Sequence, residues 1–198
     1  TVYLGEQVCS RRHEMRLEDW IALGEMLAGH GKEVVLSSQV LVEGEGDLKL
    51  VRRLVGNERF RVEANDMGAV RLLAGQPGWV AGPHLNVYNP RTLEMLAELG
   101  ATRWVAPVEI ARDALEGILA ERPAGMETEV FGYGRLPLAF SARCFTARRY
   151  NLQKEACEFR CGEFPDGMAL RSGDQPQQAA SLQPEAAVAS PVASSPIP

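Results

Sequence analysis

Two kinds of hydrophobic pattern alternate along the chain. Short runs rich in β-branched and aromatic residues are typical of buried strands, and longer runs with apolar residues at every third or fourth position are typical of helices. The predicted strands begin roughly 19 to 32 residues apart, the interval of repeated βα units. They are TVYLGEQV (1–8), EVVLSSQ (33–39), RFRVEA (59–64), GWVAGPHLN (78–86), RWVAPVE (103–109) and TEVFGYGRLPLA (128–139). The pattern predicts six consecutive strand and helix pairs.

The helical runs carry their own start and stop signals. The clearest is NPRTLEMLAELG, in which Asn89 is a good N-cap, Pro90 suits the first helical position and Gly100 suits the left-handed position after the end. LEDWIALGEMLAGHG (17–31) can end at a glycine, and RDALEGILAERP (112–123) is closed by its final proline. These signals support the alternation that the hydrophobic pattern indicates.

Six alternating units predict an α/β fold with a parallel sheet, either doubly wound or closed as a βα barrel. Each predicted strand ends in polar or ionisable residues, which a barrel would gather at one mouth. We therefore expect an incomplete (β/α) TIM-like barrel. The polar strand ends are Glu6, Gln7, Cys9, Ser37, Gln39, Glu63, Asn65, His84, Asn86, Glu109, Tyr133 and Arg135.

Six strands are two fewer than an eight-stranded barrel needs, so the first and last strands are expected to be missing from this sequence. From about Ser172 the composition shifts to Ala, Ser, Pro and Gln with few large apolar residues, which is typical of disorder. We predict a partial barrel domain with a cysteine loop over 1–171 and a disordered tail over 172–198. A frameshift or truncated gene would produce such a tail.

Composition narrows the functional classes. The chain is 45% hydrophobic and 24% charged, with a net charge of −5 and a sequence pI near 5.3. Its basic residues are mixed with acidic ones, which argues against a nucleic-acid-binding face. No apolar run approaches the roughly 20 residues of a transmembrane helix, and no signal sequence is evident. We therefore expect a cytoplasmic protein that has no transmembrane segment.

The four cysteines are the strongest chemical signal. Cys144, Cys157 and Cys161 are separated by twelve and then three residues, in a stretch predicted to be mostly loop, and Cys9 follows the first strand. In a barrel, the end of the first strand and the loop after the sixth share one face, so all four can meet. An all-cysteine set selects zinc or an iron-sulfur cluster. The spacing favours 4Fe-4S, while zinc or unligated cysteines remain alternatives.

Several motifs resemble one known family. GEQVCSRR, AGPHLNVYN, WVAPVE and above all EVFGYGRLPLAFSARCFTARRYNLQKEACEFRC resemble the ubiquinone-biosynthesis branch of the collagenase-like peptidase family. The resemblance extends from residue 1 to about 167. It implies a barrel-like protein that holds a 4Fe-4S cluster on Cys9, Cys144, Cys157 and Cys161.

The resemblance also implies partners and an activity. Members of this branch form a heterodimer with a sister subunit, UbiU, and support oxygen-independent hydroxylation of the ubiquinone ring precursor, with prephenate as an oxygen donor. Relatives elsewhere in the family hydroxylate RNA bases or are classed as peptidases. The sequence departs from the family pattern at both ends, which leaves open whether this chain functions alone. A cluster-stabilised scaffold without catalysis and a zinc-bound hydrolase are the alternative classes.

Candidate catalytic residues are weaker. His84 could exchange protons at the mouth while Asn86 orients a substrate oxygen, although a strand-end histidine often only bonds a loop carbonyl. Glu6, Glu63 and Glu109 could form a hydrolytic site, but no HExxH or GxSxG motif accompanies them. A catalytic thiol at Cys9 would need a paired histidine. We take His84, Asn86 and Glu109 as the catalytic candidates.

Overall fold

The computed structural model describes residues 1–9, 11–12, 15–132 and 144–164. Its strands are β1 (Val2–Leu4), β2 (Val34–Ser37), β3 (Arg61–Ala64), β4 (Trp79–Ala81), β5 (Ala101–Val105) and β6 (Glu127–Glu129). Its helices are α1 (Leu17–Gly29), α2 (Glu45–Val55), α3 (Met67–Leu73), α4 (Pro90–Glu98), α5 (Arg112–Ala120) and α6 (Phe145–Arg149), with short 3₁₀ helices η1 (Pro83–Leu85), η2 (Lys154–Ala156) and η3 (Arg160–Glu163).

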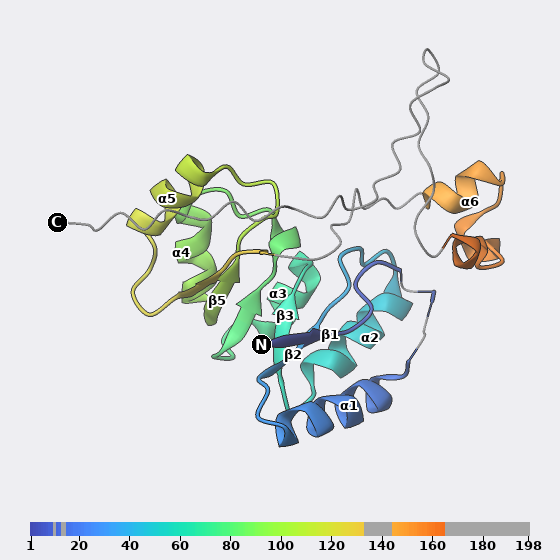
Figure 1. The fold of residues 1–198 in the computed structure, drawn as a ribbon, viewed down its shortest axis with the longest axis horizontal. Helices are drawn as coiled ribbons and strands as arrows, with labels where there is room; N and C mark the ends of the chain where they lie inside the picture. The colour runs from blue at the N-terminus through green and yellow to red at the C-terminus, as the bar shows by residue number, and fades with distance from the viewer. Residues whose placement is uncertain (10, 13–14, 133–143, 165–198) are drawn as a thin grey trace, which may run out of the picture.

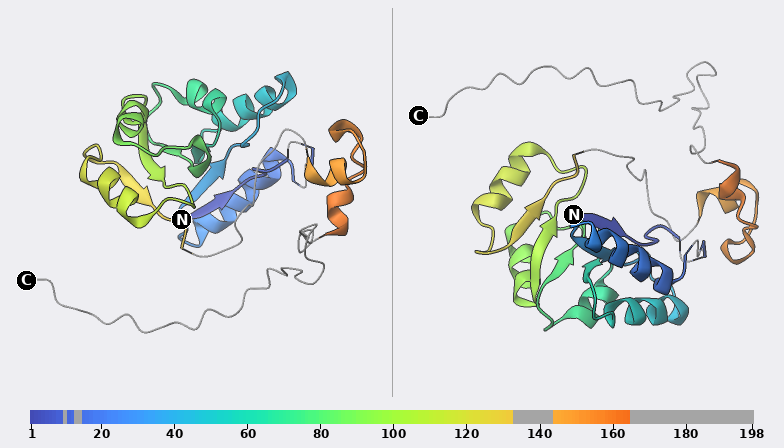
Figure 2. Two further views of the ribbon diagram at one scale, coloured as in Figure 1. Left: turned by 90° about the horizontal axis from the view of Figure 1, so that it is seen from above. Right: turned by 60° about the horizontal axis from the view of Figure 1, so that its bottom comes forward.

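The strands form one sheet in the order β1-β2-β3-β4-β5-β6, and every neighbouring pair is parallel. The sheet curls into a half-barrel with α1 to α5 around its outside (Figure 1, Figure 2). The predicted incomplete barrel is therefore confirmed. Because all strands run in one direction, their carboxyl ends lie at the same edge.

The predicted helix signals explain the helix boundaries. The Asn89 side chain accepts a hydrogen bond from the Thr92 amide at 2.9 Å, with Pro90 as the first helical residue of α4. After α4 the chain turns at Gly100, whose φ of 109° favours glycine. Helix α5 ends before Pro123, as the sequence predicts.

The hydrophobic core lies between the sheet and the helices. In β4 and β5, Trp79 and Trp104 are almost fully buried and pack in the same cluster as Leu93 and Leu96 of α4. At the other end of the sheet, Leu36 of β2 packs with α1. Alternate residues of a strand point to opposite faces of the sheet. The strand residues between these apolar positions therefore face the inside of the half-barrel.

The inner face carries an ionic network that joins the first strand to the last. Arg103 of β5 reaches Glu127 at 2.6 Å, Glu33 at 3.0 Å and Glu129 at 3.5 Å. The Tyr3 hydroxyl of β1 donates to Glu129 of β6. Burial alone would lower the pKa of Arg103, but hydrogen bonds to Glu33 and Glu127 outweigh it and raise that pKa. Arg103 therefore stays charged. Its network links residues of different strands across the curled sheet.

Several local predictions differ from the structure, since β1, β4, β5 and β6 end before the strands that the sequence predicts. The sequence predicts a fourth strand over 78–86, but the strand ends at Ala81, because Pro83 begins η1 and cannot donate to a sheet. The sequence also predicts that the cysteine stretch is mostly loop, yet 144–164 contains α6, η2 and η3. Tyr133, Arg135 and the predicted tail over 172–198 lie outside the described residues.

Replacing Arg103 with methionine should lower the free energy of unfolding by about 2 kcal/mol, because it leaves carboxylates on three sides without their cation. The loss is smaller than for a fully enclosed ion pair, since Glu127 and Glu33 remain partly exposed. Chemical denaturation followed by circular dichroism measures it. The control is Arg91→Met, which removes a side chain that is 81% exposed. Equal unfolding midpoints for the two variants would show that the network contributes nothing.

Candidate functional site

The four cysteines come from two separate parts of the fold. Cys9 follows β1, where the carbonyl of Gln7 accepts a hydrogen bond from the Val40 amide and so fixes the path of the chain. The other three belong to residues 144–164, which we call the cysteine lobe. The lobe lies beyond the carboxyl end of β1, to one side of the sheet (Figure 1, Figure 2).

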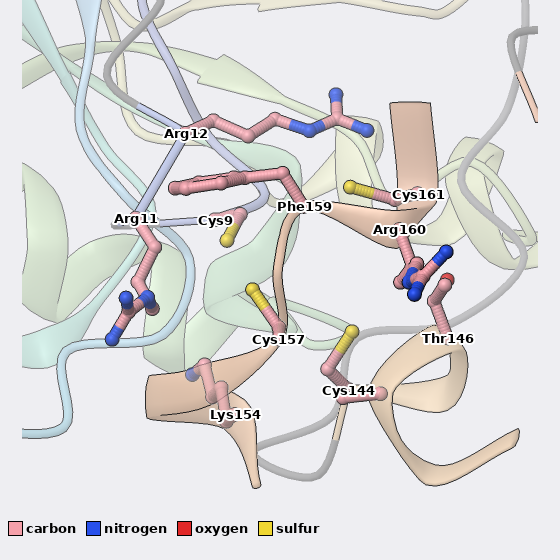
Figure 3. A pocket seen from close by; sticks show the side chains of 11 residues that line it. Cys9, Arg11, Arg12, Cys144, Thr146, Lys154, Cys157, Phe159, Arg160 and Cys161 are labelled. Atoms are coloured by element: carbon pink, nitrogen blue, oxygen red, sulfur yellow. The ribbon is translucent and has the colours of Figure 1, made fainter. Parts of the chain in front are cut away.

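All four cysteines line one small pocket between the barrel and the lobe. Each is a free, partly buried thiol. The sulfur atoms of Cys9, Cys144, Cys157 and Cys161 point into the same space (Figure 3). The pocket has a cavity volume of about 20 Å³, which is close to the size of a single water molecule and far too small for a peptide. The four thiols therefore share one pocket.

The backbone between Cys157 and Cys161 has an unusual conformation. Cys157 is right-handed helical, and the next two residues, Glu158 and Phe159, have φ values of 51° and 53°. Non-glycine residues rarely adopt this region, and such outliers concentrate at functional sites. A right-handed residue followed by a left-handed one turns successive amides to one side, a concavity used to hold anions and iron-sulfur clusters.

Four basic residues belong to the lining of the pocket. Arg11, Arg12, Lys154 and Arg160 line it, and no acidic side chain does so among the described residues. Lys154 also forms an ion pair with Glu43 of the barrel. Arg148 and Arg149 of the same lobe are not part of this lining. Arg160 likewise pairs with Glu158 at 3.0 Å and Glu163 at 2.8 Å, so the basic residues around the four thiols lie in a mixed ionic surround, in a chain with a net charge of −5.

The residues present suit a thiolate-bound inorganic group. The Nε atom of Arg11 is buried without a hydrogen-bond partner in the described part of the chain, and N–H donors next to ligand sulfurs are common outer partners of such groups. No three His, Cys, Asp or Glu side chains of the described residues are grouped so that they could hold a metal ion as they stand. A single ion would require the thiols to move together.

The lobe has almost no hydrophobic core. Ala147 is its one buried residue within 144–164. Its other internal contacts are exposed: Arg160 stacks 5.5 Å over the ring of Tyr150, whose hydroxyl donates to Glu163 at 3.1 Å. A segment of this size cannot bury enough surface to fold alone, so a bound group that links three lobe thiols to Cys9 would stabilise it.

Comparison with known families gives one assignment. The family described as Peptidase family U32 matches residues 1–163, which is most of the chain. The chain belongs to peptidase family U32. This agrees with the collagenase-like peptidase family that the sequence motifs resemble. A comparison with solved structures found no significant match.

The mouth of this U32 half-barrel contains a buried carboxyl group. Glu63 is 3% exposed, and its Oε2 accepts hydrogen bonds from Asn65 Nδ2 at 2.9 Å and Gln7 Nε2 at 3.0 Å. Burial raises the pKa of Glu63, and the nearby carboxylate of Glu129 adds to the rise. Glu63 therefore holds its proton to a higher pH than an exposed glutamate does.

The predicted catalytic residues occupy neighbouring loops of the same mouth. His84 lies in η1 after β4, and Glu109 follows β5. Their charges interact, and the Tyr88 hydroxyl donates to Glu109 Oε1 at 2.6 Å. Asn86 ends η1 in the left-handed conformation. The structure thus joins Glu109 to Tyr88 across the two loops, a contact of which the motif AGPHLNVYN gave no sign.

The predicted hydrolytic carboxylates do not act as one group. Glu63 is hydrogen-bonded to Gln7 and Asn65, whereas Glu109 is hydrogen-bonded to Tyr88.

Among the described helices, none is long and apolar enough to cross a membrane. Sequence reasoning missed Arg11 and Arg12 as pocket residues, although both stand close to Cys9 in CSRR.

The raised pKa of Glu63 predicts a pH effect on stability. The folded state binds the Glu63 proton more tightly than the unfolded state, so the stability it contributes is complete below the unfolded-state pKa of about 4.3 and is lost as pH rises through the folded-state pKa. Glu63→Gln should remove this decline. Unfolding measured at a series of pH values tests it, with exposed Glu94→Gln as the control. A pH profile that stays the same in Glu63→Gln would contradict the assignment.

Proposed function

We propose that this chain is a 4Fe-4S subunit that acts with a UbiU-like sister subunit in oxygen-independent ubiquinone biosynthesis, supporting hydroxylation of the ring precursor. The observation that carries the proposal is the meeting of Cys9, Cys144, Cys157 and Cys161 at one cationic pocket. Membership of family U32 supports the resemblance from which the activity is inferred. Within that family, the motifs around these cysteines resemble UbiV.

The four thiolates are the ligands in this proposal, and each of the surrounding groups has a role. A cluster held by four thiolates is anionic, so Arg11, Arg12, Lys154 and Arg160 offset its charge. The buried Nε–H of Arg11 has no hydrogen-bond partner among the described residues, so this donor is available to a bound group. The bound cluster would supply one-electron chemistry or a structural cross-link. Either role depends on the same residues.

Hydrolysis is the second candidate, because the family is described as a peptidase family. A cysteine peptidase needs a histidine beside its thiol. The described residues that line the cysteine pocket include no histidine. The hydroxylation proposal accounts for all four cysteines, whereas a single catalytic thiol leaves three of them without a role.

Chain purified without oxygen should contain about four iron and four sulfide per chain, with broad absorption at roughly 400 nm. Cys157→Ala should lose most of both, since it removes one of four ligands. Elemental analysis and absorption spectroscopy measure the result. Glu155→Ala is the matched control, because Glu155 is an exposed lobe residue outside the pocket lining. A colourless protein that holds zinc, or no metal, would refute the proposal and favour a structural or hydrolytic site.

Removal of the bound group should loosen the lobe and leave the barrel folded. Treatment with a chelator and an oxidant should speed tryptic cleavage after Arg148 and Arg149 by about tenfold or more, because local opening controls proteolysis. Cleavage after exposed Arg91 in α4 serves as the internal control and should not change. Mass spectrometry of timed digests measures both sites. Equal protection of the lobe before and after treatment would show that it does not depend on a bound group.

A further inference from the structure

The four-cysteine pocket has a single large apolar side chain in its described lining. Apart from the thiols, that lining consists of basic side chains, the small residues Thr146 and Ala147, and Phe159. Figure 3 shows the ring of Phe159 extending from the lobe toward the chain that carries Cys9 and Arg12. The ring therefore spans one side of the pocket, from the lobe toward the barrel.

The position of Phe159 is at the boundary between the pocket and solvent. The residue is 49% exposed, yet it belongs to the pocket lining. Part of the side chain thus contacts the pocket and the rest contacts water. An apolar group in this position limits how far solvent reaches into a thiolate site.

The backbone at this residue shows that the side chain is needed. Phe159 has φ 53° and ψ 34°, in the left-handed region. Glycine adopts this region readily, whereas a residue with a bulky side chain rarely does. The turn alone would therefore favour glycine, so the phenylalanine is explained by what its ring does.

The neighbouring residues fix the direction of the ring. The Arg160 side chain pairs with Glu158 at 3.0 Å and with Glu163 at 2.8 Å, and it stacks 5.5 Å over the ring of Tyr150. The Gly162 amide donates to the Phe159 carbonyl at 2.9 Å. These contacts hold the chain on both sides of Phe159.

We propose that Phe159 is a cover that limits the access of water and dioxygen to the four-cysteine pocket. Oxidation of cysteine sulfur depends on exposure, and an apolar shell controls solvent access to a thiolate-bound group. Phe159 itself takes part in no bond-making or redox step. Protection of a cluster rests on the proposed function, whereas protection of the thiols rests only on the lining of the pocket.

The test follows absorption at roughly 400 nm after chain purified without oxygen is moved into air-saturated buffer. Phe159→Gly should begin with the same iron content, because all four thiols remain, and should lose absorption about tenfold faster than wild type. Phe159→Leu keeps an apolar cover and should stay within about twofold of wild type. Phe145→Ala is the matched control, since Phe145 is a lobe phenylalanine that is 53% exposed and outside the described lining.

A second readout separates covering from packing. Because glycine adopts the turn without strain, tryptic cleavage after Arg148 and Arg149 should be equally fast in Phe159→Gly and wild type. Cleavage that speeds up in proportion to the loss of absorption would show that the ring only packs the lobe, and would overturn the inference. Equal loss of absorption in wild type and Phe159→Gly would overturn it as well.

Iron content decides the proposed function separately. If the chain purifies without iron, the readout is alkylation of Cys9 by iodoacetamide without oxygen, measured by mass spectrometry. In this reaction a bond forms between the Cys9 sulfur and carbon, and iodide leaves. It should run about tenfold faster in Phe159→Gly, because the thiol is less covered.

The two proposals can therefore fail independently. A chain without iron in which Phe159→Gly exposes Cys9 would refute only the proposed function. A chain with the cluster in which Phe159→Gly behaves as wild type would refute only this inference.

Discussion

The common direction of the six strands is the constraint on which every candidate site depends. In a parallel sheet all carboxyl ends lie at one edge, so residues far apart in sequence can share a surface without a long connection. Cys9, Glu63, His84 and Glu109 each follow or end a different strand. If any strand were reversed, its residue would lie at the opposite edge. The strand topology thus determines which residues lie at the mouth.

The half-barrel separates its two faces by chemistry. Apolar residues such as Trp79 and Trp104 pack toward the helices, while Arg103, Glu129 and Tyr3 interact on the inner face. Burying polar groups on the inner face costs desolvation free energy. This cost is offset only where each group has a hydrogen-bonding or ionic partner. The network around Arg103 meets that condition. Glu63 meets it differently: it accepts hydrogen bonds from two amide donors, and burial raises its pKa.

The sequence predicts the alternation of elements because pleating and helical periodicity leave clear hydrophobic patterns, and the signals at Asn89 and Gly100 fix α4 at both ends. Strand direction also explains why Cys9 lies at the same pocket as the three cysteines of the lobe. The sequence does not reveal Tyr88 or the Arg103 network, because these contacts join distant strands through side-chain directions. The short helices of the lobe escaped prediction because they lack an amphipathic period.

The edges of the sheet have a consequence for how the protein behaves in concentrated solution. A sheet that does not close presents unpaired backbone groups, which invite further strands and lead to aggregation. Both outer strands here, β1 and β6, are only three residues long. Strand β6 also begins and ends with a glutamate, Glu127 and Glu129, held inward by Arg103. Among the described strands, short and charged outer strands of this kind resist edge-to-edge pairing.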